Sequence, residues 1–230
     1  MFVLTKQKLL IVCIAAFIFF VAVWLAGSAL SSPNRQAVGD LPRDLIGKPV
    51  EFRSESGTIV RGWFVPGRKG GGAIALMHGI RANRLSMLDR ARFLSHAGYS
   101  VLVFDFQAHG ESEGEHITFG YLESRDAVAA VEWLRMNASE EKIGVIGVSM
   151  GGAAAVLASP PLNMDAMVLE IVYPTIDQAI SNRLAMRLGE WSSVLTPLLS
   201  WQLKPRLGID AEALRPIDHV GKIGAQNCSS

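Results

Sequence analysis

The sequence lacks an excess of charge and is poor in cysteine. Its 230 residues carry a formal net charge of +1, so they offer no basic face of the kind that nucleic-acid binding needs. The two cysteines are Cys13, inside an apolar run, and Cys228, near the C-terminus. Neither placement suits an internal disulfide, and neither residue has a metal-ligating neighbour. No internal repeat or compositionally biased segment occurs, which favours a packed globular domain.

One long apolar run stands out near the N-terminus. Residues 9–30 follow Lys6 and Lys8 and contain no charged side chain. A membrane-spanning helix needs about 20 mostly apolar residues, whereas the apolar core of a signal peptide has about 7 to 15. We therefore expect residues 1–30 to hold a transmembrane anchor, with a signal cleaved at the small residues 27–29 as the alternative. The two lysines place the N-terminus in the cytoplasm, so the main domain is expected on the extracytoplasmic side, as in a single-pass membrane protein.

The remaining chain divides into a linker, a main domain and a short tail. Residues 31–49 are polar and punctuated by proline, which is typical of a linker. Two alternating stretches then predict a β-hairpin, and continuous apolar runs alternate with helical periodicity from there on. This pattern predicts an α/β domain over residues 50–225, with a mostly parallel sheet covered by helices. Leu- and Trp-rich helical pieces over 174–214 predict a lid inserted above the sheet, and residues 226–230 form an irregular tail.

The chemistry is concentrated in the stretch Gly-Val-Ser-Met-Gly at 147–151. It follows a predicted strand, 143–148, and opens a run of small residues that is expected to be helical. A serine in such a turn sits at strained backbone angles, and the flanking glycines prevent side-chain collisions. Ser149 is therefore the predicted nucleophile. A tight turn with an idle serine is the alternative.

A second loop supports this prediction. His78-Gly79-Ile80-Arg81 follows the predicted strand 73–77. In acyl-transfer hydrolases the loop after this strand and the residue after the nucleophile supply the backbone N–H groups of the oxyanion hole. Those donors are expected at Ile80, with Arg81 as the alternative, and at Met150. His78 is expected to shape the loop.

Taken in order, the hairpin, His78-Gly79, the turn 104–112 and the turn 147–152 resemble the α/β-hydrolase superfamily, in particular its lipase-, esterase- and peptidase-like members. Those members read D-x-R-G-x-G-x-S at the second turn. Here Gln107 replaces the usual arginine and His109 replaces a glycine. The resemblance covers residues 50–225 and implies a Ser-His-acid triad, no cofactor and a small-molecule acyl substrate.

The partners of Ser149 are harder to find. In the superfamily the acid and then the histidine follow the nucleophile along the chain. His219 is the one histidine after Ser149, and it lies in a segment that usually precedes the acid-bearing strand. Asp177 follows the predicted strand 166–172, where some relatives carry the acid. We therefore expect the sheet to lack its last strands, as in a C-terminally shortened member.

Two functions follow from these patterns. The first is a serine hydrolase of ester, thioester or amide bonds that forms an acyl-enzyme on Ser149. The alternative is a catalytically inactive membrane protein that keeps the front half of the fold and lacks the triad acid and histidine.

Overall fold

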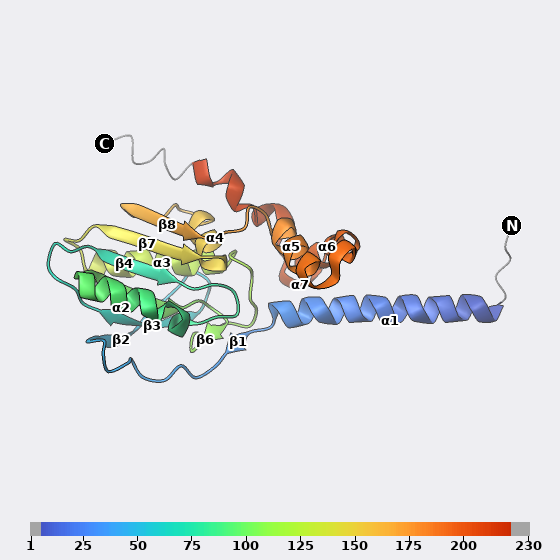
Figure 1. Ribbon diagram of the computed structural model, residues 1–230, viewed down its shortest axis with the longest axis horizontal. Helices are drawn as coiled ribbons and strands as arrows, with labels where there is room; N and C mark the ends of the chain where they lie inside the picture. The colour runs from blue at the N-terminus through green and yellow to red at the C-terminus, as the bar shows by residue number, and fades with distance from the viewer. Residues whose placement is uncertain (1–5, 222–230) are drawn as a thin grey trace.

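The structure is a computed structural model that describes residues 6–221. A long N-terminal helix extends away from an α/β domain. A group of helices lies beside the end of that helix nearest the domain (Figure 1). The predicted tail, residues 226–230, and the end of the predicted domain, 222–225, lie outside the described residues, as does Cys228. Cys13 is an exposed free thiol.

Six strands form the central sheet in the order β2-β3-β5-β4-β7-β8. The first two pairings, β2 with β3 and β3 with β5, are antiparallel, and the other three are parallel. The strands are β2 (Lys48–Arg53), β3 (Ile59–Val65), β4 (Ala73–Met77), β5 (Ser100–Asp105), β7 (Ile143–Val148) and β8 (Ala166–Glu170). The mostly parallel α/β sheet expected from the sequence is thus confirmed. A separate two-residue bridge joins β1 (Asn34–Arg35) to β6 (His109–Gly110).

Successive side chains of a strand point to opposite faces of the sheet, and here both faces are apolar. Helices therefore cover both faces. Leu76 and Val103 pack with Ala91 of α2 (Leu88–Ala97), whereas Met77 and Leu102 pack on the other face with residues of α3 and α4. Helix α3 runs over Glu123–Asn137 and α4 over Met150–Val156. A short 3₁₀ turn, Arg84–Met87, leads into α2. The core therefore has two layers, one on each side of the strands.

The segment predicted as a lid is helical along most of its length. It contains α5 (Ile176–Leu188), α6 (Ser192–Ser200) and α7 (Leu203–Leu207), followed by two 3₁₀ turns, Ala211–Ala213 and Pro216–Asp218. A further 3₁₀ turn, Gly189–Trp191, joins α5 to α6. These helices have their own small core of Ile176, Leu203, Ile209 and Leu214.

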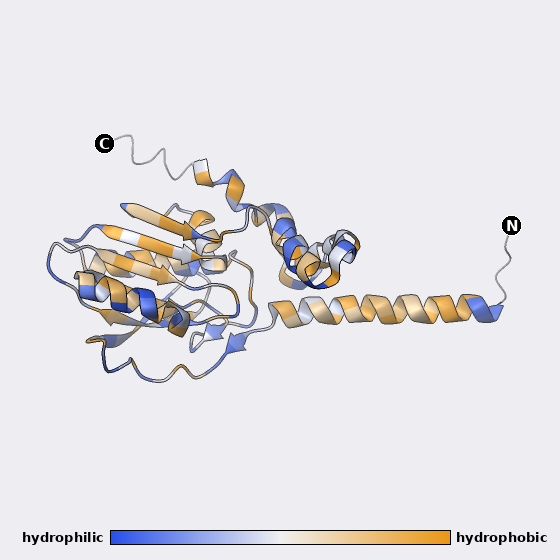
Figure 2. Ribbon diagram, in the orientation of Figure 1, coloured by the Kyte–Doolittle hydropathy of each residue, from blue (hydrophilic) through white to orange (hydrophobic). Residues whose placement is uncertain are grey.

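Helix α1 (Lys6–Ser31) is apolar on all sides, with its one polar stretch at the lysine end (Figure 2). It is long and apolar enough to cross a membrane or to serve as a signal sequence. The segment after it, predicted as a linker, lies along the domain: Leu45 is buried, and Val38 and Leu41 pack against the α2 side of the core. Its path is therefore fixed by contacts with the domain.

Candidate active site

Ser149 lies at a sharp turn between β7 and α4. Its backbone angles are φ 51° and ψ −114°, a region of conformational space that residues other than glycine seldom adopt. Such a conformation costs on the order of 1–3 kcal/mol and persists because the surroundings hold it. One contact that holds Ser149 in this conformation is the 2.8 Å hydrogen bond from its N–H to the carbonyl oxygen of Glu170.

Glycines make this turn possible because they let neighbouring main-chain segments approach each other closely. A Cβ on Gly147 would lie 2.5 Å from the Cα of Gly152, and one on Gly151 would lie 2.4 Å from the carbonyl oxygen of Met77. Both contacts are shorter than real Cβ atoms show. The strand-turn-helix geometry expected from the sequence is therefore present, and Ser149 is partly exposed at its tip.

The loop after β4 lies directly against this serine. A Cβ built on Gly79 would be 3.6 Å from the Cβ of Ser149, an ordinary contact distance. The next two residues differ in what their amides do. The Arg81 N–H donates to Nε2 of His109 at 3.1 Å, whereas within residues 6–221 no hydrogen bond is made by the N–H of Ile80 or of Met150. Of the two loop residues predicted from the sequence, Ile80 is thus the one with a free donor.

Two buried histidines brace this loop. Nε2 of His78 accepts from the Phe106 N–H at 3.1 Å, and its Nδ1 faces the Gly79 carbonyl oxygen at 2.8 Å. In His109, Nε2 accepts from Arg81 and Nδ1 faces the carbonyl of Gln107 at 2.9 Å. A nitrogen that accepts a backbone N–H carries no proton, so both rings are neutral and protonated on Nδ1.

Burial agrees with this protonation state. Desolvation, followed by repulsion from His109, lowers the pKa of His78 to about 3. Burial likewise lowers the pKa of His109. Because all four ring nitrogens are engaged, neither histidine is placed to take a proton from Ser149, and His78 shapes the loop as expected.

Sequence reasoning missed the bracing role of His109 and the ion pair below it. The Arg84 guanidinium bonds the Asp105 carboxylate at 2.7 Å, also pairs with Glu111, and stacks over the Trp63 ring at 4.2 Å. The Arg84 N–H adds a 2.7 Å bond to Asp105. These contacts tie the loop after β4 to the turn after β5. The signal in the sequence was the pair of unusual residues at that turn, Gln107 and His109.

Within residues 6–221 no hydrogen bond or ion pair joins Asp177 to a histidine. Asp177 is exposed in the first turn of α5, and its carboxylate accepts a hydrogen bond from the Ser200 hydroxyl of α6. This contact joins two lid helices. A role as the triad acid stays a prediction. Glu170, at the end of β8, pairs with Arg90 of α2.

No group of three or more His, Cys, Asp or Glu side chains that could hold a metal ion occurs in the described range. The residues around Ser149 therefore offer a serine hydroxyl, two free backbone N–H groups and no ligand set.

Comparison with known proteins gives a consistent result. Residues 69–213 match the family described as serine aminopeptidase, S33. The esterase PF2001 of Pyrococcus furiosus is 30% identical, with a TM-score of 0.61 over 74% of this chain and 69% of the esterase. The uncharacterized protein YqkD of Bacillus subtilis is 28% identical over 176 residues, covering 74% of this chain and 57% of YqkD.

Other relatives are more distant or match a shorter stretch. The uncharacterized protein YfhR of Escherichia coli is 27% identical over 150 residues, covering 63% of this chain and 52% of YfhR. The thiohydrolase aneE of Aspergillus aculeatus is 34% identical over 115 residues, covering 48% of this chain and 36% of aneE. The chain thus spans about half the length of YqkD and YfhR.

Proposed function

Because this chain belongs to the serine aminopeptidase S33 family of α/β-hydrolases, we propose that it hydrolyses ester, thioester or amide bonds through an acyl-enzyme on Ser149. The observation that carries the proposal is the geometry of one small region. A strained serine lies at the end of β7, with the free amides of Ile80 and Met150 on the two segments that meet there. The similarity to an esterase and a thiohydrolase supports ester and thioester substrates.

The proposed chemistry uses these groups as follows. The Ser149 hydroxyl oxygen attacks the acyl carbon and loses its proton to a base, while the carbonyl oxygen becomes an oxyanion. The amides of Ile80 and Met150 donate hydrogen bonds to that oxyanion. Removing one such donor typically raises the barrier by about 3 kcal/mol. Collapse of the oxyanion breaks the bond to the alcohol, thiol or amine, which leaves with the proton from the base, and the acyl-enzyme remains. Water then attacks the acyl-enzyme in the same way, releases the carboxylic acid and restores the hydroxyl.

One observation favours the alternative function, a nucleophile turn without turnover. Within residues 6–221 the Ser149 hydroxyl has no hydrogen-bonded partner, and both nearby histidines, His78 and His109, use both ring nitrogens. Catalysis without the base leaves about 10³- to 10⁴-fold acceleration over water, from binding and the oxyanion hole. The two functions therefore differ by a measurable factor.

A fluorophosphonate probe applied to the full chain tests the proposal. We expect labelling of the unchanged protein, loss of labelling in Ser149→Ala, and full labelling in Ser139→Ala, whose serine is exposed in the loop after α3. Thioester and ester hydrolysis should follow the same order. Absence of labelling in the unchanged protein, beside a labelled esterase of the same family, would establish the inactive alternative.

We also propose that α1 remains attached as a membrane anchor, with the domain on the extracytoplasmic side. The contacts at its C-terminal end support retention: Ser28 and Trp24 bond Arg206, and the Ala29 carbonyl accepts from Arg81 at 2.9 Å. A signal peptidase cutting after residue 29 would remove these groups. Protease added to sealed spheroplasts should digest the domain. Digestion confined to inverted membrane vesicles would reverse the orientation.

A further inference from the structure

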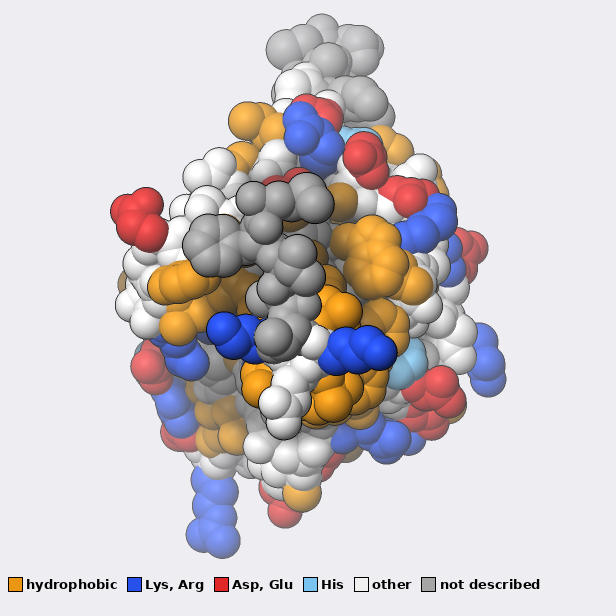
Figure 3. All heavy atoms as spheres, turned by 90° about the vertical axis from the view of Figure 1, so that its right-hand side faces the viewer, with side chains coloured by type: hydrophobic (Ala, Val, Ile, Leu, Met, Phe, Trp, Pro, Cys, Tyr) orange, Lys and Arg blue, Asp and Glu red, His pale blue; other side chains and the backbone are white. Residues whose placement is uncertain are grey.

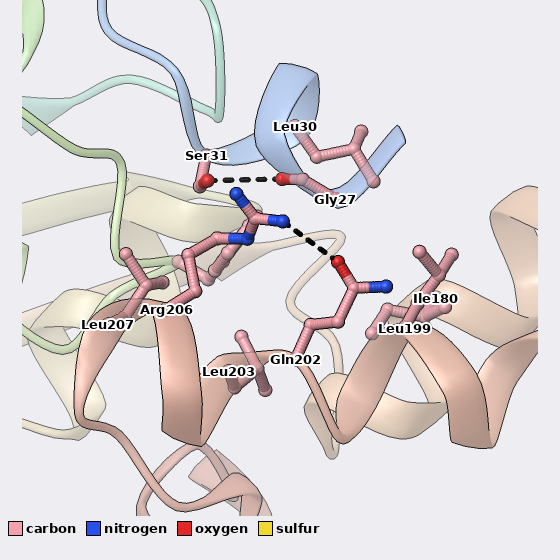
Figure 4. Close-up of a pocket in the computed structure, with 10 residues that line it drawn as sticks. Gly27, Leu30, Ser31, Ile180, Leu199, Gln202, Leu203, Arg206 and Leu207 are labelled. Atoms are coloured by element: carbon pink, nitrogen blue, oxygen red, sulfur yellow. Dashed lines mark hydrogen bonds between the residues drawn. The ribbon is translucent and has the colours of Figure 1, made fainter. Parts of the chain in front are cut away.

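The lid is attached to the membrane-facing helix by specific contacts. Arg206 of α7 donates to the Ser28 hydroxyl and to the Trp24 carbonyl, each at 2.7 Å, and its guanidinium lies 4.3 Å from the centre of the Trp24 ring. Gln202 donates to the Val23 carbonyl at 3.1 Å. Figure 4 shows both lid side chains reaching toward α1 around a cavity of about 40 Å³. The lid is thus held at the C-terminal third of α1.

Small residues of α1 allow this approach. A Cβ on Gly27 would overlap the side-chain oxygen of Gln202 at 2.2 Å, so glycine there lets the lid side chain lie against the helix backbone. Residues 27–29, which as a sequence suit signal cleavage, contact the rest of the chain in the structure: Gly27 meets Gln202, Ser28 bonds Arg206, and Ala29 bonds Arg81. Small residues serve this purpose wherever helices pack closely in membranes.

The position of these contacts along α1 fixes the depth of the lid. A helix rises about 1.5 Å per residue, so about 20 residues cross the hydrocarbon core of about 30 Å. Counted from Leu9, the first residue after the lysines, that distance ends close to Ser28. The carbonyls of Val23 and Trp24, which Gln202 and Arg206 contact, lie four to five residues before that point, which is about 6–7.5 Å inside the outer edge of the hydrocarbon. The lid residues bonded to them lie at the same depth.

The lid exposes apolar side chains on α6 and directly beside its two ends. Trp191, Val194 and Trp201 are 68%, 52% and 67% exposed, and the Trp201 ring lies 6.5 Å from that of Trp24. No residue from 191 to 203 is charged, whereas the whole lid, 174–214, carries four basic and four acidic residues, all outside that stretch. Figure 3, which looks along α1 from its N-terminal side, shows hydrophobic side chains gathered near the centre of this face, where α1 itself points at the viewer, with Lys and Arg among them.

From this placement we propose that the lid face formed by Trp191, Val194 and Trp201 docks into the interface of the membrane that α1 crosses. Tryptophan is enriched at this level of a bilayer, and arginine can extend its charged end to the headgroups while its stem stays apolar. The carboxyl ends of β4 and β7 point toward the same side of the molecule (Figure 1). The inference rests on the proposed anchorage of α1, and it does not depend on the activity of Ser149.

Three single-cysteine proteins in vesicles test the docking. The first carries Cys228→Ser and keeps native Cys13 in α1. The other two carry Cys13→Ser and Cys228→Ser with either Val194→Cys on the lid or Met136→Cys on α3, a residue that is 74% exposed. Each is labelled with an environment-sensitive fluorophore in the full chain. The vesicles contain phosphatidylcholine and phosphatidylglycerol, with or without bromine on the acyl chains.

We expect the labels at Cys13 and at position 194 to be quenched by brominated lipid and the label at position 136 to stay unquenched. Quenching at Cys13 without quenching at position 194 would overturn the docking and leave the anchor intact. A label at position 194 that is shifted to the blue but unquenched would show that another protein surface, such as a second copy, covers the lid. No quenching at Cys13 would refute the anchor, and the docking with it.

Discussion

At the scale of single residues, the turn at Ser149 depends on the absence of side chains. A Cβ on Gly151 would meet the carbonyl oxygens of Met77 and His78 at 2.4 and 2.6 Å, and neither is a flexible side-chain end. We expect Gly151→Ala to lower the free energy of unfolding by about 1–3 kcal/mol, as overpacking does, and to abolish fluorophosphonate labelling.

The matched control for that substitution is Gly144→Ala in β7. Its new Cβ would lie 3.4 Å from the nearest atom, a side-chain carbon of Ile74, so little change in the denaturation midpoint is expected. Equal destabilisation by both substitutions would show that the strand, and not the turn, is sensitive.

Two buried titratable groups give the stability an unusual dependence on pH. Burial lowers the pKa of His78 to about 3 in the native protein, whereas the unfolded chain binds a proton at this ring below pH 6.5. The free energy of unfolding therefore falls on acidification below pH 6.5. Burial raises the pKa of Asp126 to about 7. Its native carboxyl keeps a proton that the unfolded chain loses above pH 3.8, so this contribution to stability is lost as the pH rises toward 7.

Between about pH 4 and 6.5 the two groups oppose each other, each with a slope of about 1.4 kcal/mol per pH unit. In Asp126→Asn the opposing slope disappears. We therefore expect this variant to lose stability on acidification more steeply than the unchanged protein, and to be the more stable of the two at pH 8. Urea unfolding at several pH values measures both effects. Asp89→Asn, at a carboxylate whose side chain is 99% exposed, is the control, and parallel curves for all three proteins would contradict the assignment.

At the scale of elements, local pattern was sufficient for much of the fold. The predicted strands 73–77 and 143–148 coincide with β4 and β7, because runs of apolar residues bounded by Gly and polar residues specify buried parallel strands. The pattern also predicted Ile80 and Met150 beside Ser149, because the carboxyl ends of neighbouring parallel strands meet at one edge of the sheet. It could not reveal which amide was free, since that depends on His109, 28 residues beyond Arg81.

The outer strand shows what a sheet edge means physically. Strand β8 pairs with β7 alone in the described chain, and Val168 and Leu169 are 51% and 37% exposed. The sequence predicted that the sheet lacks its last strands, which would leave this strand at the edge. An uncovered apolar edge strand favours pairing with other chains.

The docking of the lid on α1 could not be predicted because it joins residues about 180 positions apart. It leads to a test by limited proteolysis in detergent. Loss of the guanidinium in Arg206→Ala removes two hydrogen bonds to α1, a third to Gln202 and the contact with the Trp24 ring. We therefore expect severalfold faster tryptic cleavage at Arg183 and Arg187 in α5. Lys204→Ala, which loses an exposed pair with Asp210, should leave the rate unchanged. Similar rates in both variants would mean that the lid is held by its own core.

At the scale of the whole molecule, α1 is part of the folded unit as well as an apolar helix. Ile117 donates to the Ser31 carbonyl and Asn34 to that of Ala108, so the helix continues into the domain without a free joint. The mature protein extracted from membranes should therefore retain residues 1–30. Intact mass spectrometry measures this directly, and a mass that corresponds to a start after residue 29 would identify a cleaved signal.

Arg81 links the loop after β4 to the N-terminal helix. Its N–H is held by His109, its carbonyl oxygen by the Asn34 side chain at 2.8 Å, and its guanidinium by the Ala29 carbonyl at the end of α1. The neighbouring amide of Ile80 is therefore linked to the end of α1 through the hydrogen bonds of Arg81. A change in the tilt of α1, as in a thinner bilayer, would pull on the loop that faces Ser149. With α1 anchored as proposed, the thickness of the bilayer would act on Arg81, one residue from the candidate oxyanion donor.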